Sequence, residues 1–323
     1  MTLSLAAVGA AQADNLTVLV ADDQAAHTEF VRELRGRQEP GSRFDLVRVP
    51  PGAADTAAPG TVPGAPVGTA PDDEREIAGV RTRSARMTAE RPMILAVGPA
   101  AARAAIDRPG SEPLLLAMLS RIDYEVLQSS PLMRRGDRRI GVLLRDPAMA
   151  DQLAVVDAVL PQKRRLGVIA TSESEPLVQE LQKAARGWTL EIEYAPDARS
   201  LASALRTLVP RSDALMVLPD LIGDSQAATL AVLRAGASAG LPVFGASDGL
   251  VRSGGLAAAV STPAQLAQQA QSLARKLVSG GGGGVLVEAA TPATVRVNTT
   301  VARGLGLRLP DERQLTERVT AAK

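Results

Sequence analysis

Short apolar runs alternate with amphipathic segments along nearly the whole chain. Residues 16–21 form a β-rich apolar run typical of a buried strand, and residues 25–37 carry apolar side chains at helical spacing. Further strands are predicted at 44–49, 93–97, 114–119, 140–144, 166–170, 189–194, 214–218, 243–245, 256–260, 285–287 and 295–297, with helices between most of them. This alternation predicts an α/β fold whose parallel sheets carry helices on both faces.

The pattern restarts near residue 138, and 323 residues are enough for two domains. We therefore expect two Rossmann-like lobes with parallel sheets, joined by a hinge of about three crossovers near residues 124–137, 248–256 and 284–288. The expected division puts residues 14–127 and 256–284 in an N-terminal lobe, and residues 128–255 and 285–323 in a C-terminal lobe. A single closed barrel of parallel strands is the competing architecture.

Two segments stand outside this pattern. Residues 1–13 form a short apolar run that ends in Ala-Gln-Ala, as at a signal-peptidase site, although a basic start is missing. We interpret them as a signal-peptide remnant, expect the natural start to lie upstream, and predict an exported protein. Residues 50–73 are rich in Pro, Gly, Ala and Thr, which predicts a loop or disordered insertion, and an Arg-rich surface helix is expected at 74–90.

The amino-acid composition excludes several kinds of functional site. The chain has no cysteine, which excludes disulfides, thiolate metal sites, cysteine nucleophiles and a lipid anchor through cysteine. Its one histidine, His27, is expected to be a half-exposed helix residue. The glycines at 280–284 are not followed by the Lys-Ser/Thr of a phosphate-binding loop. We predict no catalytic residues, no metal and no cofactor. A net charge of +1 argues against nucleic acid as a partner.

Two stretches carry a family resemblance. Residues 242–260 read PVFGASDGLVRSGGLAAAV, and residues 297–312 read VNTTVARGLGLRLPDE. The chain resembles the periplasmic substrate-binding components of ABC importers in the tryptophan/tyrosine-binding group, which are type I periplasmic binding proteins. The resemblance is specific over residues 138–311 and weaker over 16–127. It implies a periplasmic monomer that captures a small amino-acid-like or organic-acid ligand between its lobes by hinge closure and presents it to a permease in the inner membrane.

The resemblance also implies ligand contacts at the carboxyl ends of strands. There, free amides at helix N-termini suit a carboxylate and acidic side chains suit an ammonium group. The matching positions are Asp22, Asp23, Gln24, Gly98, Pro99, Ala100, Thr171, Ser172, Ser174, Pro219, Asp220, Ser247 and Asp248. Helix capping is the alternative role for Asp22, Ser172 and Ser174. The Tyr-Asn-Pro loop of the family is absent after residue 170, which leaves the identity of the ligand open.

Two other functions remain. A degenerate binding-protein fold would serve as a sensor or protein-interaction module without a transport ligand. An enzyme on a doubly wound sheet is disfavoured, because the chain shows no nucleotide loop, metal set or catalytic triad.

Overall fold

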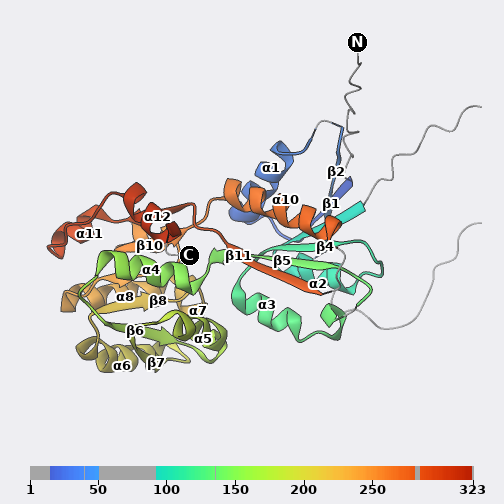
Figure 1. The fold of residues 1–323 in the computed structure, drawn as a ribbon. Coiled ribbons are helices and arrows are strands. Elements are labelled where there is room, and N and C mark those ends of the chain that lie inside the picture. The colour runs from blue at the N-terminus through green and yellow to red at the C-terminus, as the bar shows by residue number, and fades with distance from the viewer. Residues whose placement is uncertain (1–14, 40, 51–91, 135, 281–283, 322–323) are drawn as a thin grey trace, which may run out of the picture.

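The computed structural model describes residues 15–39, 41–50, 92–134, 136–280 and 284–321, which form two lobes (Figure 1). The predicted signal remnant, nearly all of the predicted insertion at 50–73 and the predicted helix at 74–90 lie outside these residues. Within the described ranges, no helix combines the length and the apolar character needed to cross a membrane.

The first lobe is built on a six-stranded parallel sheet in the order β11-β5-β4-β3-β1-β2. Its strands are β1 (Asn15–Val20), β2 (Arg43–Arg48), β3 (Pro92–Val97), β4 (Leu114–Leu119), β5 (Ile140–Pro147) and β11 (Val285–Ala290). Its helices are α1 (Ala25–Gly36) and α10 (Pro263–Ser279) on one face, and α2 (Pro99–Asp107), α3 (Arg121–Gln128) and the short η1 (Pro131–Arg134) on the other.

The centre of this sheet explains its apolar sequence. Every residue of β4 is buried, because helices cover both of its faces and strands flank both of its edges. On one face, Phe30 and Leu34 of α1 lie one helical turn apart and share a core with Leu273 of α10. Aliphatic side chains therefore supply almost the whole core of a chain that has 2% aromatic residues.

The second lobe repeats the plan with the strand order β12-β10-β9-β8-β6-β7, in which only β12 runs antiparallel to its neighbour. Its strands are β6 (Arg165–Ala170), β7 (Thr189–Tyr194), β8 (Ala214–Val217), β9 (Val243–Phe244), β10 (Ala257–Val260) and β12 (Thr294–Val297). One face carries α4 (Met149–Val159), α5 (Glu175–Ala184), α11 (Thr299–Gly304) and α12 (Glu312–Ala321), and the other carries α6 (Ala198–Leu208) and α8 (Gln226–Ala239). Short helices η2 (Ser172–Ser174), η3 (Val209–Arg211), α7 (Leu221–Asp224) and α9 (Asp248–Arg252) lie in the connections.

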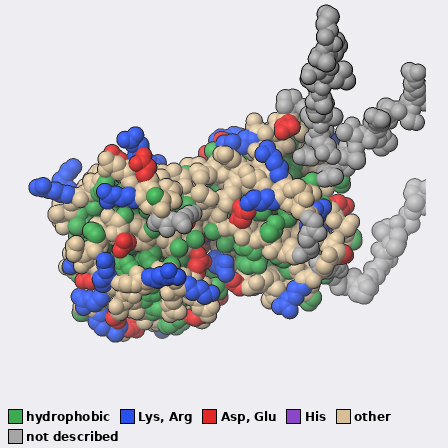
Figure 2. Space-filling view, in the orientation of Figure 1, with side chains coloured by type: hydrophobic (Ala, Val, Ile, Leu, Met, Phe, Trp, Pro, Cys, Tyr) green, Lys and Arg blue, Asp and Glu red, His purple; other side chains and the backbone are tan. Residues whose placement is uncertain are grey.

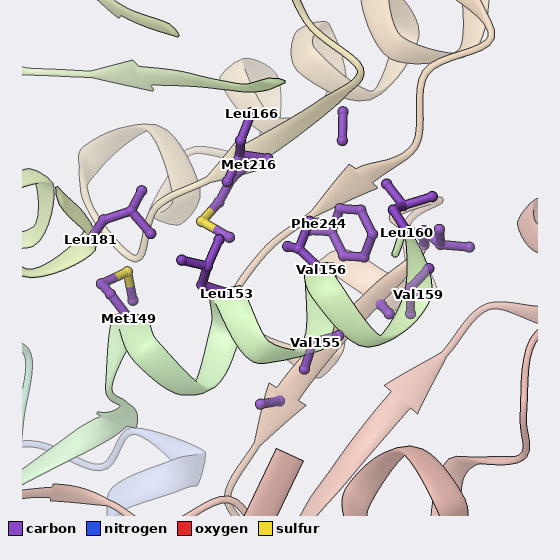
Figure 3. Close-up of a cluster of buried hydrophobic side chains, with 14 of the residues drawn as sticks. Met149, Leu153, Val155, Val156, Val159, Leu160, Leu166, Leu181, Met216 and Phe244 are labelled. Atoms are coloured by element: carbon purple, nitrogen blue, oxygen red, sulfur yellow. The ribbon is translucent and has the colours of Figure 1, made fainter. Parts of the chain in front are cut away.

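The core of the second lobe forms where α4 lies along its sheet (Figure 3). Leu153 and Val156 of α4 point toward Met216 and Phe244 of the sheet, and Phe244 is only 1% exposed. This lobe thus has its own hydrophobic core, separate from those of the first lobe.

The chain passes between the lobes three times, at positions that differ from those expected. The passages follow β5 at residue 148, β10 at residues 261–262 and β11 at residues 291–293. The last two lie side by side, because Ser261 Oγ donates to Thr291 O at 2.5 Å and Ala293 N donates to Val260 O at 2.8 Å. With the passage after β5, they make three connections between the lobes.

The expected lobe boundaries were therefore wrong at three strands. Residues 140–147 and 285–290 were assigned to the C-terminal lobe, but they pair as β5 and β11 in the first sheet. Residues 257–260 were assigned to the N-terminal lobe, but they pair as β10 in the second sheet. The expected class is confirmed: two separate α/β lobes with mostly parallel sheets, and not one closed barrel.

Candidate ligand site between the lobes

The carboxyl ends of the parallel strands of both sheets face the space between the lobes. The chain enters the other lobe directly after the carboxyl ends of β5, β10 and β11, so these ends must lie at the junction. The neighbouring parallel strands end on the same side of each sheet. Ligands of open α/β sheets bind at such strand ends, so this junction is the first place to look for a site.

Two predicted residues lie after β1. Asp22 is a third exposed, and its Oδ1 lies 2.7 Å from His27 Nδ1 and 3.1 Å from the backbone N of Gln24. Gln24 is exposed and precedes α1 without a side-chain cap. His27 is 4% exposed, so the expectation of a half-exposed histidine was wrong. The partner that buries it, Gly98, comes from a distant strand end that helical periodicity does not reveal.

The turn after β3 requires glycine. Gly98 has φ +81°, and a Cβ at this position would lie 2.6 Å from His27 Cε1. Gly98 N donates to Ala117 O of β4 at 2.9 Å. Pro99 begins α2, Ala100 is exposed, and no side chain caps this helix, which leaves its first amides facing the junction.

Asp23 is bound to a neighbouring side chain. Arg48 at the end of β2 donates from one guanidinium nitrogen to Asp23 Oδ2 at 2.9 Å and from the other to Oδ1. The hydrogen bonds from Arg48 lower the pKa of the Asp23 carboxyl. Because both side chains are largely exposed, the pair lies on the rim of the lobe.

The end of β4 carries backbone strain and a complete helix cap. Met118 has φ 62°, and among the described residues it alone has a positive φ without being glycine. The register of β4 against β5 shifts at this point, which indicates a bulge. Ser120 Oγ accepts from Asp123 N at 3.0 Å, and Asp123 Oδ2 accepts from Ser120 N at 2.9 Å. Strain of this kind is concentrated at functional sites.

In the second lobe, three predicted residues form a buried network. Ser174 Oγ lies within hydrogen-bond distance of Thr171 N and Oγ1, at 3.0 and 2.9 Å, and donates to Asp220 Oδ2. Asp220 Oδ1 accepts from Ile222 N at 2.9 Å and Gly223 N at 3.1 Å. Burial raises the pKa of Asp220 against these hydrogen bonds. The network holds β6, β8 and α7 together.

The remaining predicted residues lie at the same strand ends. Ser172 is exposed and Pro219 is half-buried. Ser247 caps α9 by accepting from Leu250 N at 3.2 Å. Asp248 forms ion pairs with Arg252 at 2.6 Å and Arg296 at 3.4 Å. The structure therefore gives Ser247 and Asp248 stabilising partners within the second lobe.

A charged group that the sequence did not identify joins the lobes. Arg145, near the end of β5, lies 3.3 Å from Asp146 and 3.4 Å from Asp224 of α7, measured between side-chain nitrogen and oxygen atoms. Burial raises the pKa of Asp146 from 3.8 to about 6, against the attraction of Arg145, and Asp224 and Asp123 raise it further. Figure 2 shows acidic and basic side chains together in the seam between the lobes.

The same seam contains a cavity between α3 of the first lobe and α5 of the second. Its volume is about 330 Å³. It is lined by Arg121, Glu125, Glu175, Pro176, Gln179, Glu180 and Lys183, none of which was predicted. Such polar helical residues have no sequence pattern that separates them from ordinary solvated positions. Ile122 of α3 also packs against the core of the second lobe, so the lobes are in contact here.

A larger hollow, of about 520 Å³, lies on the outer face of the second lobe between α6 and α8. Alanine, leucine and valine side chains form most of its lining, and it is remote from the strand ends. Size alone therefore does not identify the site. Within the described ranges, no group of three or more His, Asp or Glu residues is placed to hold a metal ion.

These features define a two-lobed α/β binding protein with polar groups gathered at the junction of its lobes. The profile of the ABC transporter substrate binding protein family matches residues 78–318, so the chain belongs to this family. No curated protein matches the chain.

Solved structures show the same fold. The ABC domain of Streptococcus pneumoniae in complex with L-Trp is 15% identical with a TM-score of 0.56, covering 95% of this chain and 98% of that one. The ligand-free, open form of CD0873, a substrate binding protein with adhesive properties from Clostridium difficile, is 16% identical with a TM-score of 0.62, covering 92% and 96%. A conserved domain protein from Vibrio cholerae is 18% identical with a TM-score of 0.55, covering 95% and 98%. The expected type I periplasmic binding protein fold is confirmed.

Proposed function

We propose that this chain is the ligand-capturing component of an ABC importer. It takes a small amino-acid-like or organic-acid ligand between its lobes by hinge closure, outside the cytoplasm, and presents both lobes to a membrane permease. It acts as a monomer and catalyses no reaction. The observation that carries the proposal is the direction of the two sheets, whose carboxyl strand ends meet at a junction crossed by three connecting segments.

The junction offers two kinds of polar group. The helices α1 and α2 begin there without side-chain caps, so their N-terminal amides suit a carboxylate. Asp22 lies just before the start of α1 and is a third exposed, which suits a positively charged group. The combination fits a zwitterion better than a sugar or a nucleotide.

A thermal-unfolding screen with amino acids and small organic acids tests the proposal. A ligand present at one hundred times its Kd stabilises the folded state by about 2.7 kcal/mol, which raises Tm measurably. Ala100→Trp, which fills the start of α2, is expected to abolish the shift. Ala202→Trp, on an exposed site of α6 beside the outer hollow, is the matched control and is expected to keep it. If only Ala202→Trp loses the Tm shift, the ligand binds at the outer hollow and not between the lobes.

A sensor or protein-interaction module is the second candidate. The observation that favours it is the buried network of Thr171, Ser174 and Asp220, whose polar groups already have partners within the lobe. Under this function, no compound in the screen raises Tm.

A further inference from the structure

Each lobe has one point where its strand order changes direction. In the first lobe the chain goes from β1 outward to β2 and then returns to the other side of β1 as β3. In the second lobe β6, β7 and β8 follow the same path. Such a change opens a crevice between the carboxyl ends of two neighbouring strands, where ligands of open α/β sheets bind. Each lobe places an aspartate at this crevice: Asp22 after β1 and Asp220 after β8.

The aspartate of the second lobe is fully engaged by the fold. Both of its oxygens have partners, since Oδ1 accepts two backbone amides and Oδ2 accepts from Ser174. Asp220 is 2% exposed. Because the side chain is buried and both of its oxygens are engaged, Asp220 offers little to an incoming ligand.

The aspartate of the first lobe is engaged on one oxygen. The contacts of Asp22 with His27 Nδ1 and with Gln24 N both end on Oδ1. Arg48, at the end of the neighbouring strand β2, is bound to Asp23. Within the described residues, no lysine or arginine pairs with Asp22, whose side chain is a third exposed. Oδ2 is the acceptor that remains for an incoming group.

His27 is held firmly enough to orient this carboxylate. It is 4% exposed and lies against Gly98, where even a Cβ would come within 2.6 Å of its ring. A carboxylate only accepts hydrogen bonds, so the contact requires the proton on His27 Nδ1. With the ring fixed, Oδ1 is fixed as well, and no hydrogen bond within the described residues engages Oδ2.

We infer that His27 is a positioning residue that holds Asp22 so that its second oxygen binds the ammonium group of the ligand. The inference rests on the proposed capture function and narrows it to ligands that carry a primary amine. His27 itself does not touch the ligand. A charge-assisted hydrogen bond in this setting corresponds to an affinity difference of about 10- to 100-fold between a ligand and its analogue without the amine.

Titration calorimetry with matched probe pairs tests the inference on the full chain. The pairs are L-tryptophan with indolepropionate and L-leucine with isocaproate, which differ only by the amino group. Wild type is expected to prefer the amine-bearing member of the pair it binds by about 10- to 100-fold. His27→Leu and Asp22→Asn are expected to reduce the preference to within about threefold. His27→Asn, whose side-chain amide replaces the Nδ1 donor, is expected to retain most of it.

Phe30→Leu is the control for a purely structural effect, because Phe30 is buried in the same helix as part of the hydrophobic core. It is expected to lower Tm and leave the preference unchanged. If wild type binds both members of a pair equally, or if His27→Leu keeps the preference, the inference is overturned while ligand capture stands. Equal weakening of both members in His27→Leu and His27→Asn also overturns it. If only compounds without an amine raise Tm, the amine requirement is wrong. If no compound raises Tm, ligand capture fails and the inference falls with it.

Discussion

Alanine substitutions at two glycines with positive φ distinguish the cost of backbone strain from the cost of a side-chain clash. Gly98→Ala is expected to destabilise the folded chain by about 2–4 kcal/mol, because alanine resists φ +81° and its Cβ would collide with the His27 ring. Gly240→Ala is the matched control: φ is +67° at the end of α8, but nothing lies within 4 Å of a Cβ. It is expected to cost about 1 kcal/mol. Chemical denaturation measures both, and equal losses would contradict the close contact with His27.

Asp220 offers a test of a buried carboxylate with a purely structural role. Asp220→Ala removes the acceptor for Ile222 N, Gly223 N and Ser174 Oγ, and is expected to lower the free energy of unfolding by about 2–4 kcal/mol. Asp220→Asn keeps the capping oxygen and supplies an amide beside Ser174, so it is expected to recover most of this loss. A full loss in the asparagine variant, measured by urea denaturation, would argue against the assigned contacts.

At the residue scale, the sequence located the strand ends but not the partners of their side chains. Asp220 and Ser174 are 46 positions apart, and only the pairing of β6 with β8 brings them together. His27 was misjudged for the same reason, since Gly98 covers it from another strand. Local patterns report which face of a helix is apolar and carry no information on which strand ends lie beside it.

The end of β5 gives a pH-dependent prediction at the scale of one element. The pKa of Asp146 is raised from 3.8 to about 6, chiefly by burial, so the folded chain binds this proton more tightly than the unfolded chain. Its stabilising contribution is present below about pH 4 and is lost as the pH rises through about 6. Asp146→Asn, which resembles the protonated form, is therefore expected to be more stable than wild type by about 2 kcal/mol at about pH 7 and equally stable near pH 4.

Denaturant unfolding at both pH values checks this prediction. Asp157→Asn, on the exposed side of α4 beside Arg164, controls for the loss of one negative charge. A stability difference between Asp146→Asn and wild type that stays constant with pH would show that burial does not hold the proton on this carboxyl.

Among elements, long apolar runs were predictable and short polar helices were not. The twelve strands in the described part of the chain lie within a few residues of their predicted positions. The central ones, such as β4, are continuously apolar because they are buried on both faces. The helix α3 was missed, since its eight residues RIDYEVLQ bury little besides Leu127. Its stability comes from the Ser120–Asp123 capping box and from contact with the other lobe.

The contact of α3 with the second lobe is a property of the whole molecule. Ile122 packs against the core of that lobe, and its truncation to alanine is expected to weaken the lobe contact by about 1–2 kcal/mol. The expected result is a larger radius of gyration in small-angle X-ray scattering without a comparable loss of Tm. Val126→Ala, on an exposed site of the same helix, is the control and is expected to change neither. Unchanged scattering in Ile122→Ala would show that this contact does not limit opening.

At this scale the sequence predicted the two lobes but misplaced their crossovers. The strands β5, β10 and β11 are short apolar runs like those around them. Their sequences do not indicate which of the two sheets each strand joins. Their assignment depends on pairing across long sequence separations, as between Val285 and Ile140. The elements do repeat after residue 138, yet the chain adds β5 to the first sheet before it leaves the lobe and returns later to add β11.

Amide hydrogen exchange, with and without a pool of the common amino acids, tests the central claim most directly because it requires no prior choice of ligand. The account predicts slower exchange on adding the pool at the strand ends of both lobes, in residues 21–27, 98–103 and 219–225, and unchanged exchange in the outer helices α6 and α8. Protection confined to the outer face, or no protection anywhere, would contradict capture between the lobes.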